Sequence, residues 1–357
     1  MDVLELVELA IGLVFILVAA ELFTNGIEWF GHKLNLAEGA VGSVLAAVGT
    51  ALPETMIPLI AILFAGTRAD PEAAHQVGVG AILGAPFMLS TLAMFVTGIG
   101  VIYWSGRRAT GRQMPVDTHV LGMDVHYFFV AYAIAVGAAF IPSEYSFLRY
   151  GVVIVVIGIY AWYVKSHFES DVTIDAVDLA PLRFQRLDRR AYQRDPQGHP
   201  RLRVVNLQVI VALAMIVLGA FVFVDGVEHI SKSAGLDPAL LALIIAPIAT
   251  ELPEKFNSLI WVRQTKDTLA MGNITGAMVF QSCIPTAIGI ALAADAWTIS
   301  SDSLLSFASA GIAFLSTAAI FIPMMRRGTL SGTNLLIGGL FYVLYVLIVV
   351  ARLAGVI

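Results

Sequence analysis

The stretch Thr50-Ala51-Leu52-Pro53-Glu54 returns 200 residues later as Thr250-Glu251-Leu252-Pro253-Glu254, and each copy lies near the middle of a long apolar run. An ionisable residue at bilayer depth costs about 2.5 to 3.5 kcal/mol or more, so a glutamate kept at that depth indicates a functional site. A kinked helix end with its glutamate at the membrane interface is the simpler interpretation of one copy. Two copies at matching depth argue against it.

The prolines change the chemistry of the backbone around them. Pro53 has no amide N–H, so the carbonyl of Gly49 loses its usual helical partner, and Pro253 has the same effect on Ala249. Irregular backbone survives in a bilayer only where protein or a wet cavity surrounds it, and there its free carbonyls can bind a cation. The sequence therefore predicts a break in each of the two helices.

Hydroxyl groups complete the pattern. Thr50 lies one helical turn before Glu54, and Thr250 lies one turn before Glu254, so each hydroxyl shares a helix face with its carboxylate. Each half of the chain then offers a carboxylate, a hydroxyl and a freed carbonyl. We predict one shared cation site, with ligands from Glu54, Glu254, Thr50, Thr250, Gly49 and Ala249.

The composition defines the class of protein. Of the 357 residues, 58% are hydrophobic and 13% are charged, which predicts an all-α membrane protein and excludes a soluble core. The single cysteine, Cys283, provides neither a disulfide framework nor a thiolate metal site, and no His-Glu-x-x-His motif occurs. We therefore expect no enzyme activity and no cofactor. Nothing indicates a nucleic acid or a protein partner.

Ten membrane-spanning helices are predicted from the apolar runs. They cover about residues 3–31, 38–65, 73–103, 120–141, 147–165, 204–232, 238–262, 267–294, 303–325 and 331–353. With the N-terminus outside, the inner connections hold 16 of the 21 Lys and Arg residues. The positive-inside rule then predicts that both termini lie outside a plasma (cytoplasmic) membrane.

An internal repeat divides the chain. When the two Leu-Pro-Glu sites are superposed, further residues match: Asn25-Gly26 with Asp225-Gly226, Glu28 with Glu228, Gly80 and Gly84 with Gly272 and Gly276, and Ser90 with Ser282. Five helices per repeat force the second copy to start on the opposite side of the membrane. We predict two inverted five-helix repeats, 1–165 and 204–357, and a cytoplasmic connecting loop at 166–203. The arginine-rich part of that loop predicts a short basic amphipathic helix at the lipid headgroups.

These residues resemble the cation/calcium exchanger superfamily, the sodium/calcium exchanger membrane region. Residues 48–54 look like its first α-repeat motif, Gly-Thr-Ser-x-Pro-Glu, and residues 249–254 are similar to the second. The third and eighth predicted helices look like its Gly-Asn-x-x-Gly-Ser-Asn pattern, and the resemblance covers 12–100 and 212–295. It implies that the two motif glutamates are the central cation ligands. It also implies that the first and sixth helices slide against the rest during transport.

The chain departs from the family pattern in the third and eighth helices. Ala81, Ala85-Pro86 and Met278 stand at expected ligand positions, whereas the amide is kept as Asn273. Calcium takes six to eight oxygen ligands. Besides the six groups above, we therefore consider accessory oxygens from Asn273, Gln281, Ser90 and Ser282. The glycines of these two helices predict close helix packing.

Glu251 and Lys255 add two charges beside Glu254. They are one helical turn apart, so Lys255 can neutralise Glu251 or occupy an ion position itself. The alternative is that Lys255 extends its ammonium group to the cytosolic surface. On the presumed sliding helices, four polar residues either line access paths or are interfacial: Asn25, Glu28, Asp225 and Glu228.

The leading hypothesis is secondary active antiport of calcium, or a similar divalent cation, against sodium or protons. Protons rival sodium because protonating both glutamates would cancel the charge that a divalent cation satisfies. A proton-coupled exchanger of another cation and a cation channel are the alternatives. An inverted repeat with a site at the bilayer midplane favours alternating access over a channel. The expected partners are the transported cations and the lipid bilayer.

Overall fold

The computed structural model describes residues 3–33, 47–67, 70–169, 180–187, 200–235, 252–300 and 303–353. Most of this part of the chain is helical. The helices are α1 (Val3–Lys33), α3 (Ala47–Leu63), α4 (Pro71–Met88), α5 (Met94–Tyr103), α6 (Thr118–Gly137), α7 (Leu148–Glu169), α9 (Leu202–Ala234), α11 (Leu252–Arg263), α12 (Asp267–Leu292), α13 (Leu304–Arg327), α14 (Gly332–Leu335) and α15 (Ile337–Leu353). A π-helical turn, η3 (Leu89–Ala93), joins α4 to α5, and short 3-10 turns include η6 (Arg183–Leu187).

Seven of the described helical stretches are long and apolar enough to cross a membrane. They are Pro71–Tyr103, Thr118–Phe140, Leu148–Ser166, Leu202–Ser233, Ala270–Leu292, Leu304–Arg327 and Gly332–Arg352. Two shorter apolar stretches, Leu9–Phe23 and Glu54–Leu63, belong to α1 and α3. The helical membrane architecture is therefore confirmed. The predicted spans at 38–65 and 238–262 lie partly outside the described residues, so ten spans in two inverted repeats stay a prediction.

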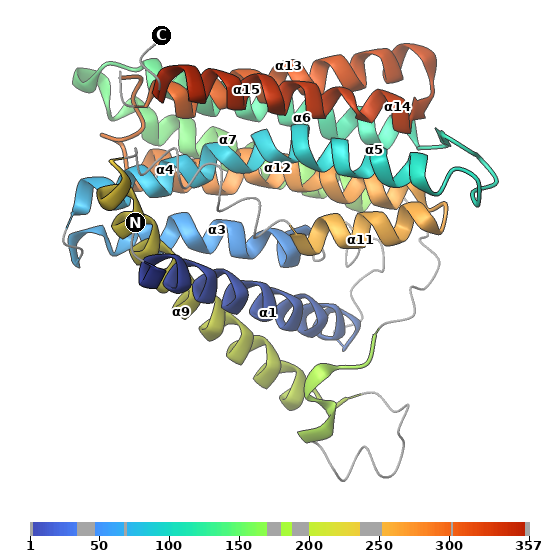
Figure 1. The fold of residues 1–357 in the computed structure, drawn as a ribbon, viewed down its shortest axis with the longest axis horizontal. Helices are drawn as coiled ribbons and strands as arrows, with labels where there is room; N and C mark the ends of the chain where they lie inside the picture. The colour runs from blue at the N-terminus through green and yellow to red at the C-terminus, as the bar shows by residue number, and fades with distance from the viewer. Residues whose placement is uncertain are drawn as a thin grey trace.

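The helices form a large bundle with a separate pair beside it. Figure 1 shows α3 and α11 in one row between the bundle and the tilted pair α1 and α9. In this view, the N-terminal ends of α3 and α11 point toward each other. Helix α12 packs against both of them and also against α4, α6 and α7. This central place makes α12 the element that links the two motif helices.

The largest core cluster belongs to the bundle. It contains buried side chains from α4 to α7 and from α11 to α15, with Ile62 from α3, and its buried members include none from α1 or α9. The pair packs instead through three smaller clusters. One of these joins α1 and α9 to α3 and α4 through Leu9, Ile16, Ile57 and Phe223. Most of the apolar burial that stabilises the bundle is thus independent of the pair.

Helices α1 and α9 approach each other closely at glycines. A Cβ atom added to Gly12 would lie 2.9 Å from the backbone N of Phe223, and one added to Gly219 would lie 2.7 Å from the Ile16 side chain. Gly26 packs in the same way against Val209. Small residues let membrane helices gain packing contacts that larger side chains would prevent. The sequence therefore specifies α1 and α9 as partners.

A buried ion pair joins the loop after α5 to the start of α12. Nη2 of Arg108, in the loop after α5, contacts Oδ2 of Asp267 at 2.7 Å, and both side chains are fully buried. Arg108 also donates to the carbonyl of Val262, at the end of α11. In the same region, β1 (Gln113–Met114) pairs antiparallel with β2 (Leu330–Ser331), a small sheet that the helical patterns did not predict. These contacts fix the start of α12.

We expect the replacement Arg108→Ala to destabilise the fold by about 3 to 5 kcal/mol, because it leaves the Asp267 carboxylate buried without its cation. Thermal unfolding in detergent, followed by the loss of monodisperse protein, measures this. The neighbouring exposed residue gives a matched control, since Arg107→Ala removes the same charge from the surface. Equal unfolding temperatures for the two variants would contradict the role of the buried pair.

Candidate cation-binding site

Helix α3 places Glu54 inside the protein. The residue is only 5% exposed, and α3 packs against α12, α4 and α9. A carboxylate at this depth needs donors or positive charge around it. The predicted break in this helix is wrong, since α3 is helical through Pro53. Pro53 nevertheless has no amide N–H, so the carbonyl of Gly49, four residues earlier, lacks its usual helical donor.

Gln281 of α12 reaches the same part of α3. Its Nε2 donates to the carbonyl oxygen of Ala51 at 3.5 Å, and that carbonyl also accepts from the hydroxyl of Thr55 at 3.0 Å. The Oε1 atom of Gln281 is buried and accepts no hydrogen bond within the described part of the chain. A neutral oxygen is thus available beside the turn that carries Glu54. The role of Gln281 as an accessory ligand stays a prediction.

Helix α12 contains a proline with the same effect as Pro53. Pro285 lies inside the helix, four residues after Gln281, so the backbone carbonyl of Gln281 also lacks its amide donor. This second oxygen was missed from the sequence. The sequence contains the pattern that could have predicted it, because Pro285 follows the polar residue Gln281 by four positions within an apolar run.

The two predicted serine ligands are buried and bonded within their own helices. The Ser90 hydroxyl donates to the carbonyl of Phe87 at 3.0 Å, and the Ser282 hydroxyl donates to that of Val279 at 2.8 Å. The lone pairs of these two hydroxyl oxygens can still accept a hydrogen bond or bind a cation. Ser90 lies in the π-helical turn η3, where its carbonyl accepts from Ser316 of α13 at 2.6 Å. Wide turns of this kind occur often at functional sites.

The second copy of the motif is described only in part. Helix α11 begins at Leu252, so Pro253 occupies the first turn, where a helix needs no amide donor. For Glu254, as for Gly49 and Thr50, the structure gives the helical backbone alone. Three predicted site residues lie outside the described residues: Ala249, Thr250 and Glu251.

Lys255 lies inside the protein. It is 5% exposed, so the interpretation in which its ammonium group extends to the cytosolic surface is wrong. A buried ammonium group must be compensated by negative charge or by hydrogen-bond acceptors. Lys255 directly follows Glu254 in the sequence of α11, and it adds a buried positive charge to the helix that carries the second motif.

The eighth predicted helix is less tightly packed than its glycines suggested. Among the residues that the structure describes, a Cβ atom added to Gly272 would meet nothing within 4 Å, and one added to Gly276 would meet the hydroxyl of Tyr163 at 3.4 Å. The half-buried Asn273 has an Nδ2 atom without a partner among the described residues. The prediction of close packing is therefore wrong at Gly272, which leaves room beside Asn273.

One buried carboxylate was missed from the sequence. Asp124 of α6 accepts hydrogen bonds from the hydroxyls of Tyr163 at 3.0 Å and Thr275 at 2.6 Å. These bonds join α6 and α7 to α12 close to Gly276. Asp124 stood within a predicted span, so the rule that selected the glutamates would have selected it too. Its contacts indicate that it positions α12.

The described side chains contain no group of three or more His, Cys, Asp or Glu residues that could hold a metal ion. The region around Glu54 instead combines one buried carboxylate with neutral oxygens from α3 and α12. Such oxygen donors suit hard cations, whereas sites for soft metals use thiolates or imidazoles. The oxygen atoms of this region are therefore of the kind that binds a hard cation.

Comparisons with known proteins agree with this chemistry. A family model described as sodium/calcium exchanger protein matches residues 4–166 and 205–354, most of the chain. The candidate antiporter CaxA of Alkalimonas amylolytica is 25% identical over 337 residues, which covers 91% of each chain. An uncharacterised membrane protein of Methanocaldococcus jannaschii, MJ0091, is 21% identical over 75% of this chain and 76% of its own.

Solved structures share the fold. The H+/Ca2+ exchanger CAX superposes with a TM-score of 0.66 at 18% identity, over 98% of this chain and 88% of that one. The sodium-calcium exchanger NCX_Mj superposes with a TM-score of 0.56 at 16% identity, over 98% and 99%. The family model covers both halves of the sequence, motifs included. The chain therefore belongs to the sodium/calcium exchanger protein family.

Proposed function

We propose that the protein is a secondary active antiporter that moves calcium, or a similar divalent cation, in exchange for sodium or protons. The observation that carries this proposal is the buried Glu54 on α3 beside the Gln281 oxygens of α12. Calcium prefers carboxylate and carbonyl oxygens, six to eight in number. Glu54, Gln281 and the freed Gly49 carbonyl supply part of this set. The second motif, with Glu254, Thr250 and Ala249, supplies the rest.

The inverted repeat belongs to the same proposal. We assign residues 1–165 and 204–357 to two five-helix repeats and 166–203 to a cytoplasmic loop, with both termini outside the plasma membrane. The two segments matched by the family model, 4–166 and 205–354, support this division. The row formed by α3 and α11, with their N-terminal ends toward each other, supports it further (Figure 1).

Antiport is favoured over a cation channel by the packing around Glu54. Its side chain is almost completely buried, and α3 packs against α1, α4, α9 and α12. A site closed in this way must be opened to one side at a time, as alternating access requires. A channel needs a continuous pore with weak sites along it.

Calcium uptake into proteoliposomes under separate sodium and pH gradients tests the function and identifies the coupling ion. We expect uptake that saturates and requires an ion on the opposite side. A sodium gradient alone, or a proton gradient alone, should suffice to drive it, and whichever does so is the coupling gradient. Calcium flux that needs no opposing ion would show a channel instead.

Neutralising either motif glutamate should reduce calcium uptake to background, because Glu54→Gln or Glu254→Gln removes one of two charges that match a divalent cation. The amide keeps nearly the same shape, so the fold should persist. The exposed residue Glu72 gives the control, as Glu72→Gln removes a carboxylate outside the site. Full calcium uptake by either motif variant would show that the substituted glutamate is not a ligand of the transported cation.

Lys255→Met should change the ion preference, because a buried positive charge beside Glu254 repels other cations. Competition of sodium, protons and other divalent cations with calcium measures the effect. The exposed Lys266 provides a matched control in Lys266→Met. If the competition is unchanged in Lys255→Met, the charge of Lys255 does not act on the transported ion.

A further inference from the structure

One cluster of polar side chains outside the region of Glu54 is satisfied within the protein. It surrounds residues 180–187 of the connecting loop, which lie against the ends of α1 and α9. There Leu182 is buried in an apolar cluster with Trp29 of α1 and with Val204 and Val205 of α9. This placement differs from the basic helix at lipid headgroups that the sequence predicted. The described part of that region contains the short turn η6, and Leu182 packs into protein.

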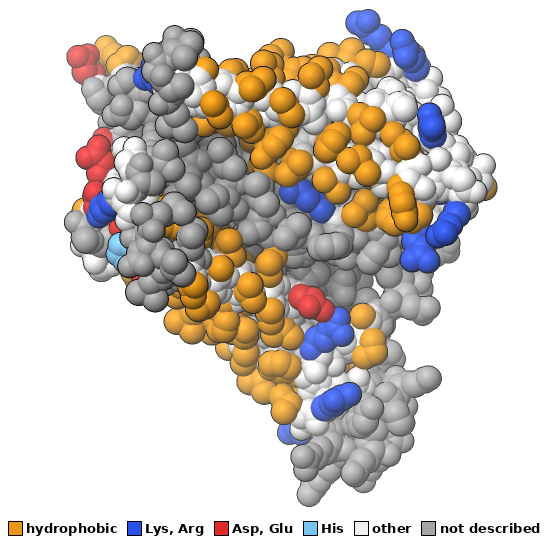
Figure 2. Space-filling view, viewed as in Figure 1, with side chains coloured by type: hydrophobic (Ala, Val, Ile, Leu, Met, Phe, Trp, Pro, Cys, Tyr) orange, Lys and Arg blue, Asp and Glu red, His pale blue; other side chains and the backbone are white. Residues whose placement is uncertain are grey.

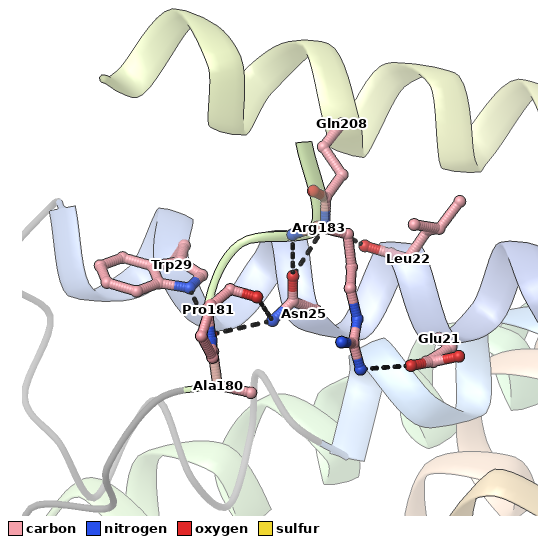
Figure 3. Close-up of polar contacts among 8 residues, drawn as sticks. All are labelled: Glu21, Leu22, Asn25, Trp29, Ala180, Pro181, Arg183 and Gln208. Atoms are coloured by element: carbon pink, nitrogen blue, oxygen red, sulfur yellow. Dashed lines mark hydrogen bonds and ion pairs between the residues drawn. The ribbon is translucent and has the colours of Figure 1, made fainter. Parts of the chain in front are cut away.

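Asn25 of α1 and Gln208 of α9 bond to the backbone of this segment (Figure 3). Nδ2 of Asn25 donates to the carbonyls of Ala180 at 3.2 Å and Pro181 at 3.4 Å. Its Oδ1 accepts from the amide of Arg183 at 3.1 Å and from Nε2 of Gln208 at 3.0 Å. Both polar atoms of the Gln208 amide are hydrogen-bonded as well. Asn25 thus binds backbone groups instead of lining an access path, and the two amides leave no group free for a ligand.

A second polar cluster lines a pocket of about 380 Å³ between the start of α4 and the segment that joins α12 to α13. The predicted orientation places both of these segments on the outer side of the membrane. Most Asp and Glu side chains in Figure 2 lie toward the end of the bundle where α4 begins, whereas Lys and Arg predominate at the other end. The polar side chains that line the pocket include Glu72, His75, Asp295, Thr298, Ser303 and Ser306.

The charge of the pocket is negative. Glu72 lies in the first turn of α4, and Asp295 follows the end of α12. In the described part of the lining there is neither Lys nor Arg. The nearby Lys232 is paired with Asp70, the residue that caps α4, at 3.8 Å between Nζ and Oδ2. Two carboxylates in one cleft favour a positively charged ligand.

The wall that carries Asp295 is held in place by buried bonds. Trp297 is fully buried, and its indole N–H donates to the carbonyl of Ala135 at 3.0 Å. The guanidinium group of the buried Arg149 donates to the carbonyl of Ala294. These bonds fix the backbone on both sides of Asp295. The pocket is therefore formed by the fold itself, as binding sites for small molecules usually are.

Ser306 of α13 is the residue that points to a ligand. It is only 1% exposed and lines the pocket, yet its hydroxyl has no hydrogen-bond partner in the described part of the chain. A serine within a helix commonly bonds to a carbonyl of the preceding turn, as the Ser309 hydroxyl does with the carbonyl of Ser306 at 2.6 Å. A buried hydroxyl without a partner costs free energy. A ligand that bonds to Ser306 would remove this cost.

The size and lining of the pocket indicate a small molecule instead of a bare metal ion. Calcium holds its oxygen ligands at about 2.3 to 2.6 Å, and the described Asp, Glu and His side chains form no group that could hold a metal. Pockets of about 300 to 1,000 Å³ take small organic ligands. Val79 and Ala296 add apolar surface beside the hydroxyls. A suitable ligand therefore combines a positive charge, N–H donors and a short hydrocarbon chain.

We propose that this pocket binds a short aliphatic amine in its ammonium form. The ammonium group pairs with the carboxylates of Glu72 and Asp295 and donates to the hydroxyl of Ser306, while the hydrocarbon chain contacts Val79. Such amines are protonated at neutral pH, as a lysine side chain is. Neither Glu54 nor Gln281 lines the pocket, so this site goes beyond the proposed antiport function.

Calorimetric titration of the purified full chain in detergent tests the proposal. The probe is diaminobutane with its amino groups at the two chain ends, and butanediol with terminal hydroxyls is the matched neutral compound. We expect saturable binding of the diamine and none of the diol, because the carboxylates of the pocket select for charge. Equal binding of both compounds, or no binding of the diamine, would overturn the proposal.

Substitutions place the diamine in the pocket. Asp295→Asn should weaken its binding by about tenfold, because a charge-assisted hydrogen bond is lost. Ser306→Ala should weaken it by about threefold or more and should fold normally, since the hydroxyl has no bond to lose within the described structure. Matched controls outside the pocket lining are Glu144→Gln, at an exposed carboxylate, and Ser309→Ala, at a buried hydroxyl of α13. Both controls should bind the diamine as the wild type does.

The same titration separates the pocket from the cation site. Glu54→Gln should bind the diamine with unchanged affinity, whether or not the protein exchanges calcium. Loss of diamine binding in that variant would place the amine at the ion site and overturn the proposal. Unchanged affinity in Asp295→Asn or in Ser306→Ala would also overturn it.

Discussion

The bilayer interior leaves no polar group to be satisfied by water, and this constraint governs where the chain buries its charges. Glu54, Asp124, Glu228 and Lys255 are each almost fully buried, and each lies on a helix that packs against several others. A charged side chain that is buried between helices loses its contacts with water and needs polar groups of the protein as partners instead. For Asp124 those partners are hydroxyls of α7 and α12, and the result is a fixed joint. For Glu54 we propose that the oxygens of Gln281, on the neighbouring helix α12, help to bind a cation.

The polar contacts divide the molecule into a frame and a separate pair. The frame is held by bonds that converge on α12: Asp124 with Thr275, and Arg108 with Asp267. The α1–α9 pair has its own polar cluster around Asn25 and Gln208, and its glycines keep the two helices in contact. Polar bonds therefore lie mainly within each part, whereas the contacts between the parts are mostly apolar, with an exposed ion pair between Lys232 and Asp70.

Much of this organisation could be predicted from the sequence, because long hydrophobic runs indicate membrane-spanning helices. A glutamate within such a run has a high free-energy cost in the bilayer, so it indicates a function. The helical membrane class followed from the composition and the apolar runs, and the family followed from residues 50–54 and 250–254. The break at Pro53 did not, since neighbouring helices can keep a proline-containing helix straight. The loose packing at Gly272, the burial of Lys255 and the bonds of Asn25 also could not be predicted. They depend on which helix lies opposite, and spacing along the chain does not report that.

We propose that the identity of the coupling ion depends on the charge balance around the second motif. Two glutamates carry a charge that one divalent cation, two sodium ions or two protons can equally neutralise. Lys255 breaks this equivalence, because its buried ammonium group reduces the local negative charge unless another carboxylate offsets it. Glu251, one turn earlier, is the nearest candidate in sequence. With that offset the site keeps the full charge for a divalent cation, and without it the site favours a monovalent ion or a proton on one glutamate. We therefore propose that the groups around Lys255, as well as the two glutamates, select the ion that is exchanged.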